Sequence, residues 1–448
     1  GGSLATQTHD KDAGPGRIGQ LIGADIEDGE GTGVLDLSSP IDSAELGVVS
    51  EASVAQVMRA IDTAAKAGRS WARRSPTERA SVLLAIADAI AERREEIAHA
   101  ITLEQGKPYA GEAVYEVDDL AATARQAAGD ISRLESPVLP SPDPGKRVLT
   151  FRAPLGVVAV ISPWNYPTLP GLQALPAIAA GNAVVAKPSE VTPWTALLIG
   201  EAMLEAGLPP GLFNLLNGGA EVGARLVEAE GVAAVYFVGS SSTAESVVRG
   251  AGMERTLVEA SGNGPVIVCA DGNLQRAAEA LTMGALANAG QICAATGRVL
   301  VERSVHDDLV EEIVAQARGW RLGNPLDEGT TVGPMTHLPT AERVRDQLRE
   351  AGELGAELAF AGDPAGFEGA HYVPPAVLGN VPPKARAHHQ ETFGPLIPVV
   401  PFDDDEVLLQ RAVERGGRHA ADDRSDIRWR GDLRIGVELR VARMRACS

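Results

Sequence analysis

Residues 156–189 read GVVAVISPWNYPTLPGLQALPAIAAGNAVVAKPS, and this stretch decides the fold class. Two apolar, β-rich runs, residues 156–163 and 182–189, enclose a segment of helical length. Runs that are apolar on both faces are typical of strands in a parallel sheet covered by helices. The stretch therefore predicts one strand–helix–strand unit of an α/β protein.

The same alternation continues for another seventy residues. The runs LFNLLNG (212–218), AAVYFVG (233–239) and RTLVEAS (255–261) are again separated by segments of helical length. For the helix over 193–206, Thr192 is the expected cap and Gly207 the expected stop. Ligands of such sheets bind at the carboxyl ends of the strands. The chemically unusual residues at those ends are Asn165, Lys187, Gly239, Ser240 and Glu259.

The flanking segments have different patterns. Residues 51–134 are helical, and in SPTERASVLLAIADAIAERREEI Ser75 and Glu78 form an expected capping box with Pro76 in the first turn. Residues 136–156 are rich in proline and predict a connection and an edge ribbon. A second α/β alternation follows, with strands at 297–302 and 371–379 and helices over 304–317 and 340–354.

Bulk properties narrow the functional classes. The chain has 448 residues and a formal net charge of −20, which argues against nucleic acid as a partner. No apolar run approaches the roughly 18 residues of a membrane span, and GGSLATQTHDKDAG at the N-terminus does not resemble a signal peptide. Three cysteines do not make a disulfide framework, so a reducing cytoplasm is the expected location.

Two motifs are ambiguous when taken alone. Cys293 lies in NAGQICAATGRVLV (288–301), where it could be an inert gap-filler beneath a strand or a reactive thiol. NGGAEVG (217–223) opens a helix after the third strand, but glycine-rich turns are common for steric reasons. Glycines at a helix N-terminus nevertheless let a dinucleotide phosphate approach.

Six motifs occur in a fixed order: PWNYP, GNAVVAKPSEVTP, FVGS, LVEASGNGP, GQIC and ETFGP. In order and spacing they resemble the NAD(P)-dependent aldehyde dehydrogenase superfamily, from about Gly33 to Phe402. The resemblance implies an α/β fold with a Rossmann-type parallel-sheet cofactor domain, an α/β catalytic domain and a partial oligomerisation ribbon. The domains expected are 21–135 with 156–260 for NAD, 136–155 for the ribbon and 261–405 for catalysis, after a flexible N-terminus over 1–20.

The resemblance assigns chemistry to three residues. Cys293 corresponds to the nucleophile that attacks the aldehyde carbonyl. The side-chain amide of Asn165 and the backbone N–H of Cys293 correspond to the donors that hold the resulting oxyanion. Glu259 corresponds to the general base for hydrolysis of the thioester. No metal is implied.

The cofactor contacts implied by the resemblance are equally specific. Lys187 and Glu190 match positions that hold the adenosine ribose, and a carboxylate at Glu190 favours NAD over NADP, although NADP stays open. The full expected set comprises Trp164, Lys187, Ser189, Glu190, Gly218, Gly223, Gly239, Ser240, Glu391 and Phe393.

Each residue also has a structural explanation. Asn165 could cap the following helix, Lys187 and Glu190 could be solvated strand-end charges, and Phe393 could fill the core. Glu259 stands in an apolar strand, where burying an unpaired carboxylate is costly. After it, ASGN departs from the two glycine-type positions and the lysine usual in the family. The substrate is poorly specified, and Tyr166, Leu169 and Leu172 are the expected lining of an aldehyde tunnel.

The resemblance ends near Asp405. Residues 406–448 are an atypical tail with ten arginines and no lysine, which fits a divergent solvated tail or a shifted reading frame. The expected function is oxidation of a small-molecule aldehyde to a carboxylic acid through a cysteine thioester. The alternatives are a non-catalytic member that only binds NAD and a coenzyme A-acylating enzyme. A homodimer or homotetramer is implied, but the altered ending puts it in question.

Overall fold

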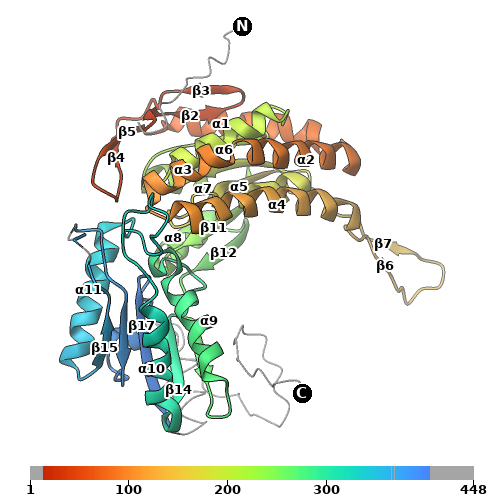
Figure 1. Cartoon of the computed structure of the whole chain (residues 1–448). Coiled ribbons are helices and arrows are strands. Elements are labelled where there is room, and N and C mark those ends of the chain that lie inside the picture. Colours follow the sequence, from red (N-terminus) through yellow and green to blue (C-terminus); the bar gives the residue numbers. More distant parts are fainter. Residues whose placement is uncertain (1–13, 365, 368, 404–448) are drawn as a thin grey trace. The chain divides into compact units, whose positions relative to one another are not determined.

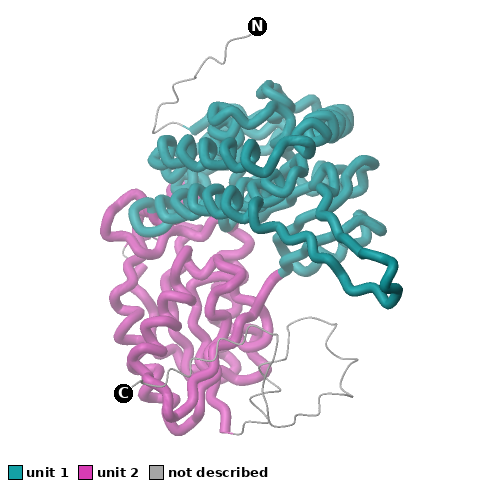
Figure 2. Tube along the Cα trace, turned by 90° about the vertical axis from the view of Figure 1, so that its right-hand side faces the viewer, with its two compact units in different colours: residues 1–39, 43–105, 109–260 teal, residues 40–42, 106–108, 261–448 magenta. Residues whose placement is uncertain are grey.

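The computed structural model describes residues 14–364, 366–367 and 369–403. The chain divides into two compact units (Figure 2). Unit 1 contains the described residues up to Ser39, then Ser43–Gln105 and Tyr109–Ala260. Unit 2 contains the described residues from Ser261 onward and the short segments Pro40–Asp42 and Gly106–Pro108. The tail expected over 406–448 lies outside the described residues.

A seven-stranded sheet forms the centre of unit 1, in the order β12-β11-β8-β9-β10-β2-β3. Its first five strands are parallel, which confirms the predicted parallel sheet. The strands β2 and β3 extend one edge in antiparallel fashion. The bounds are β8 (Val157–Ile161), β9 (Ala183–Lys187), β10 (Phe213–Leu215), β11 (Val232–Gly239), β12 (Arg255–Ala260), β2 (Gln20–Ile22) and β3 (Asp25–Glu27).

Helices pack on this sheet in layers (Figure 1). Helices α5 (Leu169–Ala179) and α6 (Trp194–Glu205) lie on the sheet, and α2 (Pro76–Glu92), α3 (Arg94–Gln105) and α4 (Val114–Asp130) pack over them. A second group, α1 (Val54–Trp71), α7 (Ala220–Glu228) and α8 (Ser241–Ala251), also packs on the strands. Short turns η1 (Tyr109–Ala113) and η2 (Ile131–Arg133) flank α4.

Local sequence signals explain some helix ends but not others. Ser75 and Glu78 form the predicted capping box of α2, and α6 ends just before Gly207, whose φ is +87°. The prediction that Thr192 caps α6 is wrong, because the cap residue is Pro193 and no local side chain bonds the helix N-terminus. That role falls to a carboxylate far away in the sequence.

The first described residues correct another expectation. The prediction that residues 1–20 are flexible is wrong for the strand residues in that range. The strand β1 (Gly16–Ile18) and the first residue of β2 belong to sheets. The strand β1 pairs with β5 (Glu45–Ser50), which also pairs with β4 (Val34–Ser38) in a three-stranded sheet. Residues 1–13 lie outside the described part of the chain.

The proline-rich stretch after α4 forms a two-stranded ribbon. The strands β6 (Val138–Leu139) and β7 (Val148–Leu149) pair antiparallel, and all four residues are exposed. Phe151, two residues after β7, is 81 % exposed. An isolated hairpin of this length is marginally stable in water, and this ribbon exposes several apolar side chains.

Unit 2 is built around a five-stranded sheet in the order β13-β14-β17-β16-β15. Alternate residues of these strands face two separate apolar cores, one packed by α9 and α10 and the other by α11 and α12. The elements are β13 (Pro265–Val268), α9 (Leu274–Leu286), η3 (Ala287–Gly290), β14 (Arg298–Glu302), η4 (Arg303–Val305), α10 (His306–Ala317), α11 (Leu338–Glu353), β15 (Glu357–Ala361), β16 (Ala376–Gly379), α12 (Arg386–His389) and β17 (Leu396–Phe402).

The helices predicted over 304–317 and 340–354 correspond to α10 and α11, with ends that differ by at most two residues. Among the described helices, none combines the length and apolar character that a membrane crossing requires.

Candidate active site

The predicted site residues of unit 1 lie at or just beyond the carboxyl ends of its parallel strands. In the parallel register Ile161 lies opposite Lys187 and Phe237, while Glu259 lies opposite Val238. Because the strands are parallel, their carboxyl ends share one edge of the sheet. The strand-end residues Asn165, Lys187, Gly239 and Glu259 therefore lie along a single line of loops, as expected for ligand binding on such a sheet.

Asn165 lies in the loop between β8 and α5. Its side chain is buried, but α5 begins with Thr168 as cap residue and has no side-chain cap within its own first turn. Asn165 is therefore not the cap residue of α5. The neighbouring Trp164 accepts, through its carbonyl, a 3.5 Å hydrogen bond from Thr192 Oγ1, which ties this loop to the loop after β9.

Lys187 is the strand-end cation of β9. Its Nζ donates to the carbonyl of Pro188 at 2.8 Å and lies 3.5 Å from Oε2 of Glu190. Burial lowers the pKa of Lys187, and the negative charges of Glu190 and Glu51 oppose that decrease. The lysine is thus a buried cation, which corrects the alternative of a solvated strand-end charge, whereas the Glu190 carboxylate stays accessible.

Glu51 was not anticipated from the sequence. Its Oε1 accepts a 2.8 Å hydrogen bond from the backbone N–H of Gly219, at the N-terminus of α7. Together with Glu190 it places two carboxylates about Lys187. The interaction joins residues 168 positions apart, and no local motif marks Glu51.

Glycines at this edge keep the backbone close to its neighbours. A Cβ on Gly223 would lie 3.3 Å from Cδ of Lys187, and one on Gly218, whose φ is +146°, would lie 2.5 Å from Val222. Gly239 is equally constrained, because its Cβ would meet the ring of Phe237 at 2.6 Å. A side chain at any of these positions would crowd its neighbours at the start of α7 or α8.

Ser240 and Ser189 have local structural roles. Ser240 caps α8, and its Oγ accepts from the backbone N–H of Thr243 at 3.2 Å. Ser189 accepts from the N–H of Val191 at 3.3 Å. Both side chains shape the loops at the strand ends and keep those loops compact.

Glu259 differs from expectation in its environment. It was expected to be a carboxylate in a buried apolar strand, but β12 is an edge strand, so Glu259 and Leu257 are exposed within unit 1. Burial raises the pKa of Tyr236, and the negative charge of Glu259 adds to the increase. The exposed Glu259 carboxylate can contact water.

In unit 2, Cys293 follows an unusual backbone segment. Asn288, Ala289 and Gly290 have φ values of 52°, 52° and 74°, three successive left-handed residues. Such conformations cost about 1 kcal/mol or more for non-glycine residues and cluster at functional sites. Cys293 itself is a partly exposed thiol, not half of a disulfide.

Hydrogen bonds fix the loop that carries this thiol. Gln291 donates from Nε2 to the carbonyl of Asn288 at 3.0 Å, and its Oε1 accepts from the N–H of Thr336 at 2.9 Å. The N–H of Thr296 donates to the carbonyl of Gly284 at 2.9 Å. The strained segment is therefore held on both sides of the cysteine.

Glu391 and Phe393 pack beside this loop. Gly262 donates its N–H to Oε1 of Glu391 at 3.0 Å, and a Cβ on Gly262 would lie 2.8 Å from the carbonyl oxygen of Cys293. Burial raises the pKa of Glu391, while the bonds from Gly262 and Ser261 and the charge of Arg343 oppose that increase.

The ETFGP loop also contacts the cysteine loop directly. A Cβ on Gly290 would lie 2.1 Å from the carbonyl oxygen of Gly394, so the two backbones are in van der Waals contact. Phe393 has a φ of 52°, another left-handed residue. Unit 2 thus brings Cys293, Glu391 and Phe393 together, with Gly262 between the first two.

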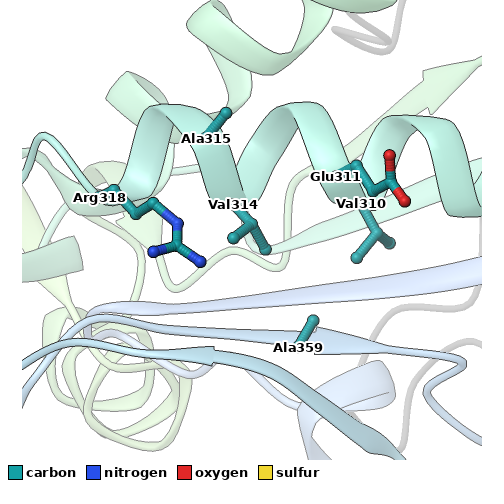
Figure 3. Close-up of a pocket in the computed structure, with 6 residues that line it drawn as sticks. All are labelled: Val310, Glu311, Val314, Ala315, Arg318 and Ala359. Carbon is teal, nitrogen blue, oxygen red and sulfur yellow. The ribbon is translucent and has the colours of Figure 1, made fainter.

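A pocket of about 480 Å³ lies elsewhere in unit 2, between α10 and β15 (Figure 3). Val310 and Val314 extend from the helix toward Ala359 on the strand, and Glu311, Ala315 and Arg318 complete the lining. None of the predicted site residues belongs to it. The pocket therefore has no part in the site described above.

The family of the chain follows from comparison with known proteins. The profile of the aldehyde dehydrogenase family matches residues 27–415. The chain belongs to the aldehyde dehydrogenase family. The family match ends at residue 415, slightly beyond the loss of resemblance placed near Asp405.

Individual aldehyde dehydrogenases resemble the chain over most of its length. The NADP⁺-dependent succinate-semialdehyde dehydrogenase of Escherichia coli K12 is 32% identical over 396 residues, which cover 88% of this chain and 82% of that enzyme. An aldehyde dehydrogenase structure from Brucella melitensis superposes with a TM-score of 0.85 at 31% identity, covering 92% of this chain and 84% of that one.

A third relative, the NAD-dependent aldehyde dehydrogenase of Sinorhizobium meliloti, has a TM-score of 0.84 at 33% identity and covers 88% of this chain and 81% of its own. The expected fold is confirmed, and this fold serves both NAD- and NADP-dependent enzymes.

Proposed function

We propose that this aldehyde dehydrogenase oxidises an aldehyde to a carboxylic acid with NAD, through a thioester on Cys293. The observation that carries the proposal is the loop of Cys293: a partly exposed thiol follows three left-handed residues. Hydrogen bonds and backbone contacts on both sides hold that strained loop. A cysteine that only fills space needs no such loop.

The residues of unit 1 fit a dinucleotide. Lys187 and Glu190 together offer a donor and an acceptor, the pair that ribose hydroxyls require. Gly239 and the N-terminus of α8, capped by Ser240, suit a pyrophosphate. When bound, the nicotinamide accepts the hydride that leaves the substrate carbon. Glu391 and Phe393 are proposed to hold its ribose and ring.

The chain's own residues account for the remaining chemistry. The sulfur of Cys293, as thiolate, forms a bond to the aldehyde carbon, and the carbonyl oxygen becomes an oxyanion. The amide of Asn165 and the backbone N–H of Cys293 donate to that oxyanion. Loss of hydride leaves a thioester on Cys293. Trp164, next to Asn165 in the chain, is proposed to contact the cofactor.

Hydrolysis completes the cycle and requires a base. Glu259 takes a proton from water, the water oxygen attacks the thioester carbon, and the carbon–sulfur bond breaks to release the acid and the Cys293 thiolate. The exposure of Glu259 on an edge strand supports this role, since a base must reach water. A general base at Glu259 also favours hydrolysis to a free acid over transfer of the acyl group to coenzyme A.

The charges about Lys187 support NAD as the preferred cofactor. Glu190 lies 3.5 Å from Lys187 Nζ, and Glu51 acts electrostatically on the same lysine. Two carboxylates accept ribose hydroxyls but repel the additional phosphate of NADP. The lowered pKa of Lys187 further weakens it as a partner for that phosphate.

For this enzyme we also propose a cytoplasmic location, a homo-oligomeric state and an apolar aldehyde as substrate. Its cysteine chemistry needs a reduced thiol, which fits a cytoplasmic location. The exposed β6–β7 ribbon suits assembly into homo-oligomers. The partly buried Tyr166, Leu169 and Leu172 stand near Asn165 in the chain and suit an apolar aldehyde.

Product formation with matched variants tests the proposal. The full chain is incubated with NAD and a panel of aldehydes that includes succinic semialdehyde, and NADH and free acid are measured together. We expect both products from the native chain, neither from Cys293→Ala, and a single burst of NADH from Glu259→Gln because its thioester persists. Binding of NAD without NADH for any aldehyde would favour a non-catalytic member, and product only with coenzyme A would favour an acylating enzyme.

A further inference from the structure

Helix α6 begins without a local cap. Its cap residue is Pro193, which offers no side-chain acceptor, and the first backbone N–H groups of a helix need partners. Glu104, at the end of α3, supplies them: Oε2 accepts from the N–H of Trp194 and Oε1 from the N–H of Thr195, both at 2.9 Å. The Glu104 side chain is fully buried.

Helix α5 repeats this arrangement with a different carboxylate. Its cap residue Thr168 has no side-chain bond to the first turn. Instead Oε1 of Glu116, on α4, accepts from the N–H of Thr168 at 3.0 Å and from its hydroxyl at 2.8 Å. Glu116 is also buried. Two carboxylates from neighbouring helices therefore hold the starts of two helices that lie on the sheet.

Each of these helix starts ends a loop that carries site residues. Residues 162–168, between β8 and α5, carry Asn165, and residues 188–193, between β9 and α6, carry Glu190. The sheet fixes the first end of each loop, and a buried carboxylate fixes the second. Because a loop anchored at both ends has fewer conformations, its side chains are better preorganised for a ligand.

The two carboxylates share one buried region. Burial raises the pKa of Glu104 to about 7, against the bonds from Thr195 and Trp194, and the like charge of Glu116 adds to the increase. Keeping two acidic groups this close is unfavourable, and neutral side chains would cap two helices with less repulsion. The presence of both carboxylates at these helix starts fits a demand for accurate placement of the loops.

We propose that Glu104 and Glu116 are paired positioning residues that act on different steps, Glu104 on binding of the dinucleotide and Glu116 on the chemical step. Glu104 acts through the loop with Glu190, and Glu116 acts through the loop with Asn165. This proposal rests on the proposed function, which gives those two loops their roles.

The variants Glu104→Gln and Glu116→Gln serve as controls for each other. Each keeps side-chain volume and one acceptor oxygen but loses the charge. In the full chain at about pH 8, above the pKa of Glu104, we expect Glu104→Gln to raise the KM and Kd for NAD about three- to tenfold, with kcat within about twofold. We expect Glu116→Gln to lower kcat about tenfold or more, with the Kd for NAD within about twofold. Glu95→Gln, on the exposed side of α3, should change neither.

Amide hydrogen exchange tests the same proposal without substrate. Glu104→Gln should speed exchange in peptides covering residues 188–197 and leave residues 163–172 unchanged, and Glu116→Gln should do the reverse. Equal loosening of both loops, or equal changes of Kd and kcat in both variants, would mean that the carboxylates only stabilise the fold. If the native chain binds no NAD, the proposed function fails, while exchange in the two loops still decides whether each carboxylate holds its own loop.

Discussion

The backbone N–H of Gly262 donates a hydrogen bond to Oε1 of Glu391 across 3.0 Å. On its other side, Gly262 faces the carbonyl oxygen of Cys293, which lies 2.8 Å from where a Cβ would stand. One glycine thus separates the proposed nucleophile from a proposed cofactor contact. Any side chain at this position has to displace the backbone of Cys293.

Gly262→Ala tests this contact. A Cβ at 2.8 Å from a backbone oxygen forces a shift, and overpacking of this kind costs about 1–3 kcal/mol. Since small misplacements of reacting groups are costly, we expect NADH formation to fall by about tenfold to a hundredfold. Gly272→Ala is the matched control, because its Cβ would lie 3.1 Å from the carbonyl of Cys269, also in unit 2. Equal loss of turnover in both variants would contradict a specific role for Gly262.

Glu190→Gln tests the source of cofactor preference. Removing this carboxylate beside Lys187 removes repulsion of the NADP phosphate, so the ratio of kcat/KM for NADP to that for NAD should rise about tenfold. Glu228→Gln, at the far end of α7, is the control and should leave the ratio unchanged. A native chain that already prefers NADP would contradict the proposed role of the two carboxylates.

These residues also illustrate what could be predicted from the sequence. The capping box of α2 was predictable because Ser75 and Glu78 are three residues apart. The cap of α6 was not, because Glu104 lies 90 residues before Trp194 and only tertiary packing joins them. Glu51 escaped prediction for the same reason.

Some features of the candidate site were likewise predictable from the sequence, and others were not. Parallel strands predict which residues share an edge, so Asn165, Lys187 and Glu259 were expected at one edge of the sheet. Burial was harder to predict, because the apolar composition of β12 does not reveal that it is an edge strand with Leu257 60 % exposed. The left-handed run Asn288–Gly290 contains two non-glycine residues, so composition gave no sign of it.

The pKa of Glu104 predicts a pH-dependent stability. Burial raises it from 4.5 to about 7, so the folded state holds a proton that the unfolded state has lost in this range. The stability contributed by this group is complete below about pH 4.5 and is lost as the pH rises through about 7, a change of roughly 3 kcal/mol. In urea unfolding, the free energy of unfolding of the native chain should therefore fall relative to Glu104→Gln by about this amount between those pH values. A difference independent of pH would show that Glu104 is ionised throughout.

The exposed β6–β7 ribbon predicts that the chain forms oligomers through this surface. Leu149 is 57 % exposed and pairs with Val138 on a hairpin too short to be stable alone. We expect Leu149→Glu to shift the chain toward monomer in light scattering coupled to gel filtration. Lys146→Glu, in the turn of the same hairpin, is the control for added negative charge. An oligomer that is unaffected by Leu149→Glu would place the interface elsewhere.

The central claim is that Cys293 is an activated nucleophile in an assembled site. The most direct measurement is its rate of iodoacetamide labelling near neutral pH, with and without NAD, resolved by peptide mass spectrometry. Cys269 is the internal reference, since it is also a partly exposed thiol of unit 2. We predict that Cys293 reacts faster than Cys269 and that NAD changes only the rate of Cys293. Equal rates for the two thiols, with no effect of NAD, would contradict the account.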